Sequence, residues 1–316
     1  MSIAETVADK NIRVAVLCGG PGGERDVSLA SGENVHQALL SAGVKHELVV
    51  VPAGDPERFL RELSCDLAVM MLHGHFGEDG VAQRILEERR IAFTGSDSDA
   101  CALAMDKNRT KELLREHGIA TPRWLVTSSP REAAAEVGLV GLKYPLFVKP
   151  NSSGSSVGVS KVESPELLIE AVTLALADDP LAMVEEMVVG DELTTGWLDG
   201  RVLPTIQMEA DGVFYDYRAK YVSEKTRYVC PANLPEKTAE AVDEFAATAA
   251  RLVGARDVAR VDLMLGVEGP MVLEVNMLPG FTAHSLLPMA AAAAGMRLEE
   301  LCVSLVAMAA ARAGIV

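Results

Sequence analysis

The sequence contains few cysteines, and none of them is spaced for a metal or redox centre. Five cysteines lie at positions 18, 65, 101, 230 and 302 of 316 residues, and no two form a CxxC pair. An odd number at irregular spacing excludes a complete disulfide framework and indicates reduced, mostly buried thiols. Such thiols belong in a reducing compartment, so we expect a cytoplasmic protein.

Apolar runs long enough for a membrane span or an export signal are also missing. The first residues, MSIAETVADKNIR, have no apolar core of signal-peptide length, and charged residues and a glycine interrupt the alanine-rich segment near the C-terminus. We therefore expect a soluble protein with no membrane partner. Positive charge is scarce as well: the net charge of -16 and the pI of about 4.8 argue against broad binding to nucleic acids or anionic lipids.

Three common nucleotide-binding motifs do not occur. The glycine-rich segment GGPGGER lacks the GxGxxG spacing of dinucleotide-binding folds. Neither the phosphate-loop sequence GxxxxGK[ST] nor the HRD and DFG signatures of protein kinases are present. If this chain uses ATP, it binds the nucleotide on another scaffold.

The first hundred residues contain an alternation of apolar strands and helices. Strands are expected at 13–17, 47–51, 66–72 and 91–93, and helices at 56–63 and 80–89. A further helix after the glycine-rich turn has apolar positions at Val27, Val35, Leu39 and Leu40. This alternation predicts a parallel, doubly wound α/β layer.

Polar residues follow the first and third of these strands. Open α/β sheets bind ligands at the carboxyl edge of their strands, which makes Glu24, Ser28 and His73 candidates for a substrate site. Each of them alone also fits a helix cap or a loop residue. The pair His73 and His75 has no third soft ligand nearby in the sequence, so a zinc site is disfavoured.

The middle of the chain contains a lysine followed by a flexible loop. A helix is expected from Ala100 to before Gly118, with Lys107 in its middle, and an extended segment follows. A strand over 144–150 then ends in Lys149 and leads into the Gly/Ser-rich loop 151–159. Small residues let backbone N–H groups approach phosphate oxygens, although loops of this composition also occur as linkers or hairpins. The preceding lysine favours phosphate binding.

The segment ARVDLMLGVEGPMVLEVN organises the rest of the chain. Two apolar runs of period two flank a turn, which predicts a β-hairpin. With the turn centred on Glu268, Asp262 lies opposite Glu274 and Arg260 opposite Asn276, and all four side chains point to one face. Before this hairpin, residues 181–189 fit a strand or a linker, 193–198 and 202–208 fit strands, and about 236–253 fit a helix.

The opposed carboxylates of the hairpin indicate a bound cation. At an effective dielectric of about 20, two carboxylates ~5 Å apart repel by roughly 3 kcal/mol, whereas a good cross-strand pair contributes only about 0.2–1 kcal/mol. Asp262, Glu274 and Asn276 form a hard oxygen set that suits Mg²⁺, which normally arrives carrying phosphate oxygens. The alternative is a solvated edge face on which Arg260 and Asp262 form an ion pair.

Eight blocks of the sequence together resemble the D-alanine–D-alanine ligase family of ATP-grasp enzymes. In chain order they are LCGGPGGERDVSLASG, LHGHFGEDG, MDKNRTK, FVKPNSSGSSVGVSKV, YDYRAKY, CPA, RVDLML and LEVNMLPGFTAHSL. Each block alone is unspecific. All eight follow the family's order, from about residue 14 to 290, which makes the combination specific.

The resemblance implies an α/β fold with an α+β C-terminal part. It implies an N-terminal Rossmann-like domain at 1–104, a central ATP-grasp lid at 105–190 and a C-terminal ATP-grasp catalytic domain at 191–316, with ATP between the last two. ATP would phosphorylate one D-alanine, and a second D-alanine would attack the acyl phosphate, giving D-alanyl-D-alanine for peptidoglycan synthesis. The implied cofactors are ATP and two Mg²⁺ ions, with Mn²⁺ as a substitute, and family members are usually homodimers.

The resemblance also implies roles for residues of this chain. The two metal ions would be held by Asp262, Glu274 and Asn276. The nucleotide phosphates would contact Lys107, Lys149 and Lys220, and the adenine and ribose would contact Glu185, Glu186, Val188, Glu192 and Phe214. The first D-alanine would lie near Glu24, which is linked to Ser155 and Tyr221, and near His73. The oxyanion would face Arg260 and the Gly280 N–H, and the second carboxylate would bind at Ser285 and Leu286.

Three positions bear on specificity. Relatives that make D-alanyl-D-lactate usually have phenylalanine in place of Tyr221, and only a phenol can hydrogen-bond Ser155, so D-alanine is favoured as the second substrate. Met277 and Arg218 stand where the family often has threonine and glutamate. We expect these departures to alter the closure of the loop 217–230 or the affinity for nucleotide, with the chemistry retained.

Three other functions remain open at this point. The nearest is another ATP-grasp carboxylate–amine ligase, including a D-alanine–D-lactate ligase. The second is a catalytically silent nucleotide-binding protein, which would be expected to lack metal ligands or lysines that this chain has. The third is a two-lobed solute-binding protein, which would need an export signal.

Overall fold

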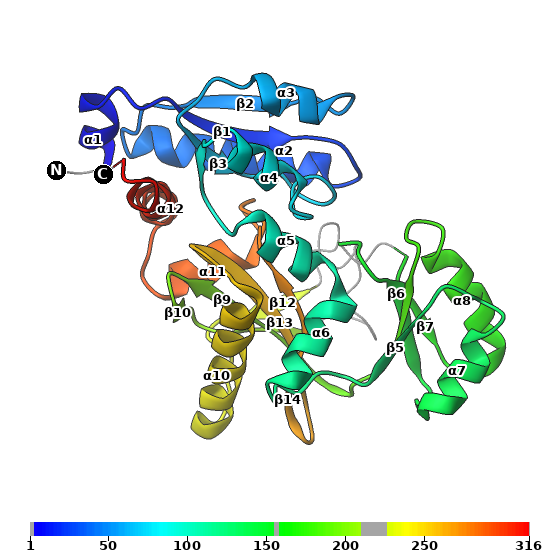
Figure 1. Cartoon of the computed structure of the whole chain (residues 1–316). Helices are drawn as coiled ribbons and strands as arrows, with labels where there is room; N and C mark the ends of the chain where they lie inside the picture. The colour runs from blue at the N-terminus through cyan, green and yellow to red at the C-terminus, as the bar shows by residue number, and fades with distance from the viewer. Residues whose placement is uncertain (1–2, 155–157, 210–225, 316) are drawn as a thin grey trace.

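Three sheets make up the fold, and the first is built by the N-terminal part of the chain (Figure 1). The computed structural model describes residues 3–154, 158–209 and 226–315. Its first elements are α1 (Ile3–Asp9), β1 (Val14–Gly19), α2 (Arg25–Ser41), β2 (Glu47–Val51), α3 (Pro56–Glu62), β3 (Leu67–Met70), α4 (Val81–Glu88) and β4 (Ala92–Phe93). The four strands are parallel in the order β2-β1-β3-β4, which confirms the predicted α/β layer.

Helices cover both faces of this sheet because alternate residues of its buried strands point to opposite sides. Val16 of β1 packs in one cluster with α2, whereas Leu17 packs in another with α3 and α4. On α2, Val35 and Leu39 are fully buried, as their spacing predicts. Leu40 was expected on the same face and is 50% exposed, so that part of the prediction was wrong.

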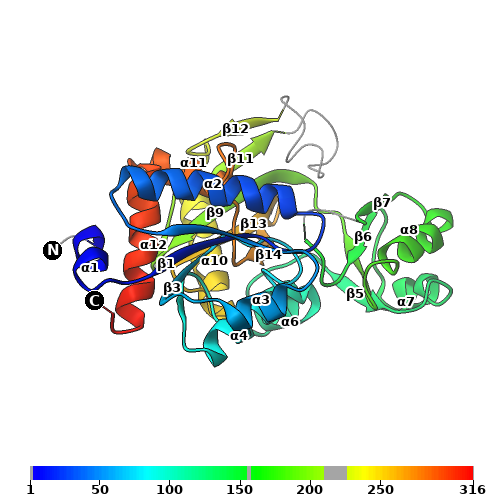
Figure 2. The same cartoon turned by 90° about the horizontal axis from the view of Figure 1, so that it is seen from above.

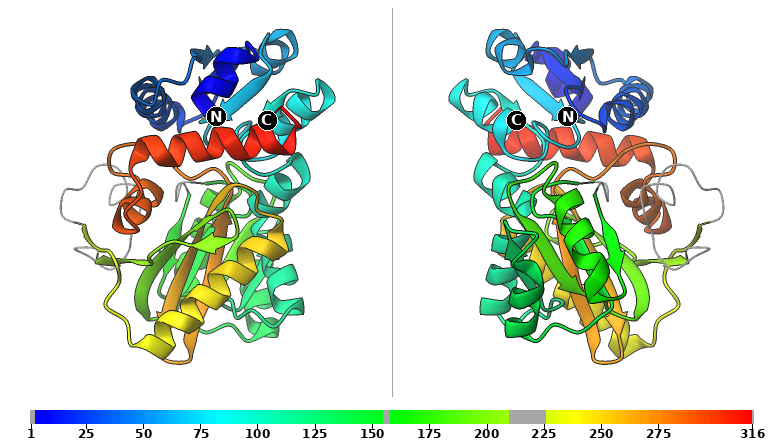
Figure 3. Two further views of the ribbon diagram at one scale, coloured as in Figure 1. Left: turned by 90° about the vertical axis from the view of Figure 1, so that its left-hand side faces the viewer. Right: turned by 90° about the vertical axis from the view of Figure 1, so that its right-hand side faces the viewer.

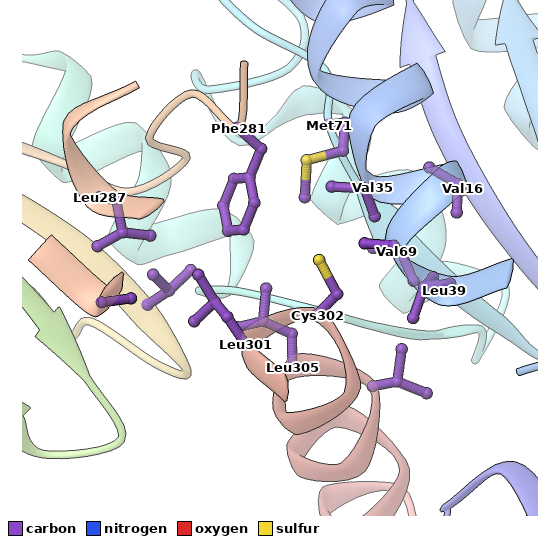
Figure 4. Close-up of a cluster of buried hydrophobic side chains, with 14 of the residues drawn as sticks. Val16, Val35, Leu39, Val69, Met71, Phe281, Leu287, Leu301, Cys302 and Leu305 are labelled. Atoms are coloured by element: carbon purple, nitrogen blue, oxygen red, sulfur yellow. The ribbon is translucent and has the colours of Figure 1, made fainter. Parts of the chain in front are cut away.

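The C-terminal helix α12 (Leu298–Arg312) returns to the first sheet. Figure 3 shows it lying between that sheet and the rest of the molecule. Its buried residues Leu301, Cys302 and Leu305 belong to the same cluster as Val16 and Leu39 (Figure 4). The helix α12 therefore holds the N-terminal layer against the C-terminal part.

The second sheet forms a separate lobe (Figure 2). Its strands β5 (Trp124–Thr127), β6 (Leu146–Pro150), β7 (Ser160–Val162) and β8 (Ala182–Glu186) are antiparallel in the order β5-β8-β6-β7. The helices α7 (Ala133–Val140) and α8 (Leu168–Ala175) contribute to one cluster against it, and the short helix η1 (Pro165–Leu167) leads into α8. The strand ending in a lysine is β6, and the segment left open between strand and linker contains β8.

Two helices, α5 (Ser98–Met105) and α6 (Lys107–Glu116), replace the single helix predicted from Ala100. The prediction was wrong at Asp106, whose ψ of 95° leaves the helical region. The Asp106 carboxylate accepts the N–H of Arg109 at 3.1 Å and thereby caps α6. This break places Lys107 at the first position of a helix, where its side chain reaches the cavity described below.

The third sheet is antiparallel, in the order β12-β11-β9-β13-β14, with β10 paired to β9. Its elements are β9 (Gly190–Leu198), β10 (Arg201–Val202), β11 (Ile206–Glu209), β12 (Arg227–Val229), α10 (Glu236–Val253), β13 (Val258–Gly266), β14 (Gly269–Asn276) and α11 (Leu286–Ala293). The helix α10 covers one face, and α11 packs on the other with α12. This antiparallel sheet with helices is the α+β part of the predicted fold.

The predicted boundaries between 104 and 105 and between 190 and 191 stay predictions. The first boundary falls inside α5, β9 begins at Gly190, and α12 packs on the first sheet. Four of the five cysteines are buried, which confirms the expectation of mostly buried thiols. Within the described ranges, no helix combines the length and the apolar character needed to cross a bilayer.

Candidate active site

A cavity of about 940 Å³ is lined by residues from distant parts of the chain. The carboxyl edge of the first sheet, the start of α6, the Gly/Ser loop and the hairpin of the third sheet all contribute to it. The predicted site residues in its lining are Glu24, His73, Lys107, Glu192, Arg260, Asp262, Glu274, Asn276, Gly280, Ser285 and Leu286. Five further candidates lie outside the lining: Ser28, Lys149, Glu185, Glu186 and Val188.

The predicted hairpin is formed by β13 and β14. Asp262 pairs with Glu274 and Arg260 pairs with Asn276, as the sequence pattern predicts. All four side chains line the cavity. Both opposed carboxylates therefore line the same cavity.

The turn of this hairpin differs from the prediction. Gly266 pairs with Gly269, so the turn has two residues and is not centred on Glu268. The register shifts by one residue between Asp262 and Leu263 through a β-bulge. The bulge compensates for the shorter turn, and this is why the predicted pairs are correct although the turn was placed half a residue too late.

The guanidinium of Arg260 forms a bidentate ion pair with both carboxylate oxygens of Asp262. Its Nε lies 2.8 Å from Oδ1, its Nη2 lies 2.9 Å from Oδ2, and the Thr194 hydroxyl donates to Oδ1 at 2.6 Å. β13 lies between β9 and β14, and Asp262 is only 7% exposed. The alternative to a cation site was a solvated edge face with an ion pair between Arg260 and Asp262. The ion pair is present, but β13 is not a solvated edge strand.

The donor set at the hairpin suits a hard cation that brings some of its own ligands. Asp262 and Glu274 supply carboxylates, and the amide of Asn276 is oriented by accepting the Leu278 N–H at 2.9 Å. Among the residues that the structure describes, no three side chains of His, Cys, Asp and Glu gather as a metal ion would require. Octahedral Mg²⁺ would therefore need oxygens from a ligand such as phosphate to complete its shell here.

Glu24 stands directly before α2, and its carboxylate lies against two glycines. A Cβ on Gly74 would come within 2.3 Å of Glu24 Oε2, and a Cβ on Gly154 within 3.6 Å of the same atom. Gly74 also has a φ of +71°, so both its backbone and its missing side chain make room for this carboxylate. Because Gly154 belongs to the Gly/Ser loop, Glu24 lies where the first and second parts of the chain meet.

His73 is buried between two polar partners. Its Nδ1 lies 3.2 Å from Glu78 Oε1, and its Nε2 lies 3.2 Å from Ser31 Oγ. His75 lies instead beside Asp79, with 3.8 Å between Nδ1 and Oδ2, and this carboxylate raises the pKa of His75. The two histidines thus have different partners. Sequence reasoning missed Glu78 and Ser31, although both lie in motifs that it had singled out.

Ser28 does not contact the cavity. Its buried hydroxyl accepts the Gly19 N–H at 2.8 Å and donates to the Met71 carbonyl at 2.5 Å. These bonds fasten the end of β1 to the chain just beyond β3. The geometry supports a structural place for Ser28 instead of the substrate contact expected from the sequence.

Lys107 links the start of α6 to the Gly/Ser loop. Its Nζ donates to the Ser153 carbonyl at 2.5 Å. Burial lowers the pKa of Lys107, and the facing Glu274 carboxylate opposes this effect. The base of the loop is tied to the same helix end, because Asn151 Nδ2 donates to Asp106 Oδ1 at 2.9 Å. The lysine and the loop are thus held together at one side of the cavity.

Lys149 and Glu185 belong to a buried charged cluster that sequence reasoning recognised only in part. Glu185 Oε1 accepts from Lys149 Nζ at 3.0 Å, and Glu185 Oε2 lies 2.5 Å from Nζ of Lys111, which is fully buried. Burial alone would raise the pKa of Glu185, but the two lysines bring it below its ordinary value. Lys111 was missed, although it lies one helical turn after Lys107, a spacing that places both on one face.

The other residues predicted for adenine and ribose lie near the junction of β8 and β9. Glu186 Oε1 accepts the Lys143 N–H at 2.9 Å. The Val188 side chain packs over Gly266, where an added Cβ would come within 3.1 Å of it. Of this group, Glu192 lines the cavity, whereas Glu186 and Val188 are not part of its lining.

A tight turn after β14 presents Gly280 and Ser285 to the cavity. Ser285 Oγ accepts the Thr282 N–H at 2.9 Å and precedes Leu286, the first residue of α11. A Cβ on Gly280 would lie 2.8 Å from this Oγ, so only glycine fits there without displacing the serine. The predicted carboxylate pocket and oxyanion donor are therefore adjacent.

Four predicted site residues lie outside the described residues: Ser155, Phe214, Lys220 and Tyr221. The same holds for Arg218 and for most of the loop 217–230. Met277, the other departure from the family pattern, is buried at the cavity wall and accepts a hydrogen bond from Ser96 Oγ to Sδ at 3.5 Å.

Comparisons with known proteins point to one family. The family model described as the D-ala D-ala ligase C-terminus matches residues 113–307. A D-alanine–D-alanine ligase of Aromatoleum aromaticum is 44% identical over 294 residues, which cover 93% of this chain and 94% of the relative.

Solved structures agree with this match. A D-alanine–D-alanine ligase from Bacillus anthracis in complex with ATP superimposes with a TM-score of 0.84 at 32% identity, covering 96% of this chain and 98% of that one. The VanG D-Ala:D-Ser ligase from Enterococcus faecalis superimposes with a TM-score of 0.83 at 28% identity, covering 94% and 99%.

Proposed function

Because the chain belongs to the D-alanine–D-alanine ligase family, we propose that it joins two D-alanines into D-alanyl-D-alanine and converts ATP to ADP and phosphate. The observation that carries this proposal is that Asp262 and Glu274 of the hairpin line the same cavity as Glu24, which follows the first strand of the first sheet. A carboxylate near an ammonium group and a metal–phosphate site must lie side by side if a small amino acid is to be phosphorylated. Peptidoglycan synthesis is the process that uses this dipeptide in the family.

The nucleotide would lie between the second and third sheets. Lys107 and Lys149 offer positive charge to its phosphates, and Lys149 is already oriented by Glu185. Phosphoryl transfer depends on charge neutralisation and alignment more than on covalent help from the protein. In the same proposal Lys220 would contact the phosphates and Phe214 would contact the adenine.

Asp262, Glu274 and Asn276 would hold the two Mg²⁺ ions expected from the resemblance. These ions, when bound, neutralise phosphate charge during transfer. In the structure Arg260 occupies both oxygens of Asp262, so metal binding has to displace the guanidinium or share the carboxylate with it. Freed from Asp262, Arg260 would stabilise the negative oxygen that forms when the second D-alanine attacks, together with the Gly280 N–H.

The two amino acids would lie next to each other in the cavity, with the amine of the second near the carboxylate of the first. Glu24 would pair with the ammonium group of the first D-alanine, near His73. A carboxylate oxygen of this D-alanine would take the γ-phosphoryl group as ADP leaves. The amine of the second D-alanine, whose carboxylate is held at Ser285 and Leu286, would then attack the carbonyl carbon, release phosphate and lose a proton. Links from Glu24 to Ser155 and Tyr221 are part of the same proposal.

D-alanine is the proposed second substrate. Relatives at 40–44% identity over most of their length are D-alanine–D-alanine ligases, whereas the D-Ala:D-Ser ligase is 28% identical. Tyr221 in this chain also favours dipeptide formation. The homodimer and the cytoplasmic location expected from the sequence stay predictions, and light scattering on the purified chain would test the first.

Phosphate release from ATP and Mg²⁺ tests the proposal. D-alanine should be required, and L-alanine or no amino acid should give only background release. Product analysis with D-serine or D-lactate as competing acceptor then identifies the second substrate. Asp262→Asn removes a metal ligand at constant shape and should abolish release. The proposal fails if the wild-type chain leaves ATP unchanged in the presence of D-alanine.

A further inference from the structure

The turn that carries Gly280 is held by two side chains of α2, on the first sheet. Ser31 Oγ accepts the N–H of Phe281 at 3.1 Å, and Asn34 Nδ2 donates to the carbonyl of Phe281 at 2.6 Å. Both backbone groups of one residue are thus bound from a helix about 250 positions earlier in the chain. Neither Ser31 nor Asn34 was among the residues predicted from the sequence.

The Phe281 side chain anchors the same turn in the core. It is 1% exposed and lies among Val35, Met71 and Leu287, as Figure 4 shows. Ser31 of α2 therefore binds the backbone of Phe281, and Val35, one turn further along the same helix, belongs to the hydrophobic cluster that contains the Phe281 ring. Gly280 directly precedes this anchored residue and lines the cavity, so the position of its N–H follows from the position of Phe281.

Ser31 also connects this turn to the predicted substrate contact His73. The two ring nitrogens of His73 lie at hydrogen-bonding distance from different partners, Nδ1 from Glu78 Oε1 and Nε2 from Ser31 Oγ, each at 3.2 Å. Ser31 Oγ therefore has two partners, His73 Nε2 and the Phe281 N–H, which it accepts. One hydroxyl thereby connects His73 to the turn that carries Gly280.

We infer that Asn34 and Ser31 are positioning residues that hold the Gly280 N–H at the point where negative charge develops. This inference rests on the proposed function, because it needs Gly280 to act as an oxyanion donor. An oxyanion donor is useful only where the charge forms, and a displacement of about 1 Å can cost a hundredfold in rate. α2 therefore serves catalysis without contacting the reacting atoms.

Asn34→Asp is the sharpest test, because it keeps the shape of the side chain and removes the N–H donor facing the Phe281 carbonyl. Asn34 is partly exposed, so the variant should fold. We expect kcat to fall about tenfold to a hundredfold while KM for ATP stays within about twofold. Ser31→Ala should lower kcat similarly. Gln37→Ala is the matched control, since Gln37 lies exposed on the same helix and its side chain donates to Glu33 Oε1, at 2.8 Å, and not to the Phe281 turn.

Hydrogen–deuterium exchange provides a second measurement that needs no activity. Amides of 278–282 should exchange faster in Asn34→Asp than in wild type or Gln37→Ala, with no ligand present. Wild-type kcat in Asn34→Asp, unchanged exchange, or a loss seen only in KM or melting temperature would overturn the inference. If the wild-type chain makes no dipeptide, the proposed function fails, whereas the exchange experiment still decides whether α2 holds the turn.

Discussion

Replacing Arg260 by alanine separates two roles that the structure places on one side chain. In the structure the guanidinium binds Asp262 through two bonds of 2.8 and 2.9 Å, and the two side chains are only 13% and 9% exposed. In the proposed reaction the same guanidinium stabilises the oxyanion. The first role concerns the stability of the ligand-free protein, and the second concerns turnover.

The two roles predict different magnitudes. Loss of one oxyanion donor costs roughly 3–4 kcal/mol in the barrier, so kcat should fall on the order of 10²–10³-fold. Removal of one partner from a buried ion pair costs about 3–5 kcal/mol. The Thr194 hydroxyl still donates to Asp262 at 2.6 Å, so we expect the lower end of that range for the ligand-free protein.

The stability loss should shrink when MgATP is added, because Asp262 then gains a cation as partner. Urea unfolding with and without MgATP measures this change, and steady-state phosphate release gives kcat and KM. We expect KM for MgATP to stay the same or to fall, since Arg260 no longer competes for the oxygens of Asp262. Arg58→Ala is the control, because its pair with Glu62 is exposed and such pairs contribute about 0–1 kcal/mol.

Three results would each refute a different part of this reasoning. Near-normal kcat in Arg260→Ala would remove Arg260 from the chemical step. A KM for MgATP raised tenfold or more would show that Arg260 helps to bind the nucleotide and does not compete with the metal. Equal stability losses with and without MgATP would argue against Asp262 as a metal ligand.

Three further predictions concern residues around the cavity. Gly74→Ala would push its Cβ to 2.3 Å from Glu24 Oε2 and should raise KM for D-alanine at least tenfold, whereas Gly43→Ala, with a similar φ of +73° and nothing within 4 Å, should not. Burial lowers the pKa of Lys111 to about 8, below its unfolded value, so the unfolded chain binds more protons between about pH 8 and 10.5 and stability should rise with pH in that window. This rise in the unfolding free energy should be roughly 3 kcal/mol in all for the wild type and should be absent in Lys111→Met. Urea unfolding at several pH values measures it, and an equal dependence on pH in the two proteins would contradict the prediction. Phe281→Ala should lower the unfolding free energy by about 3–5 kcal/mol, as for other large core truncations, and a loss below about 1 kcal/mol would contradict the packing in Figure 4.

The sequence by itself determined the elements whose signals are local. Period-two runs and a turn were enough to pair Asp262 with Glu274 and Arg260 with Asn276, and the alternation of strands and helices was enough for the first sheet. The pairing survived an error in the turn because a bulge restored the register. Where a local rule has two solutions the sequence failed, as at Asp106, whose cap ends one helix and starts another inside a continuous helical pattern.

Only the tertiary structure decided which distant residues share an environment. In three places the structure joins residues that lie 74 to about 290 positions apart: α12 packs on the first sheet, Lys111 pairs with Glu185, and Ser31 and Asn34 bind the backbone of Phe281. Periodicity marks the faces of these residues only as buried. Periodicity reports which side of an element avoids water, because that depends on neighbours along the chain. It carries no information on which partner fills the other side, since that depends on the way the three sheets close around one cavity.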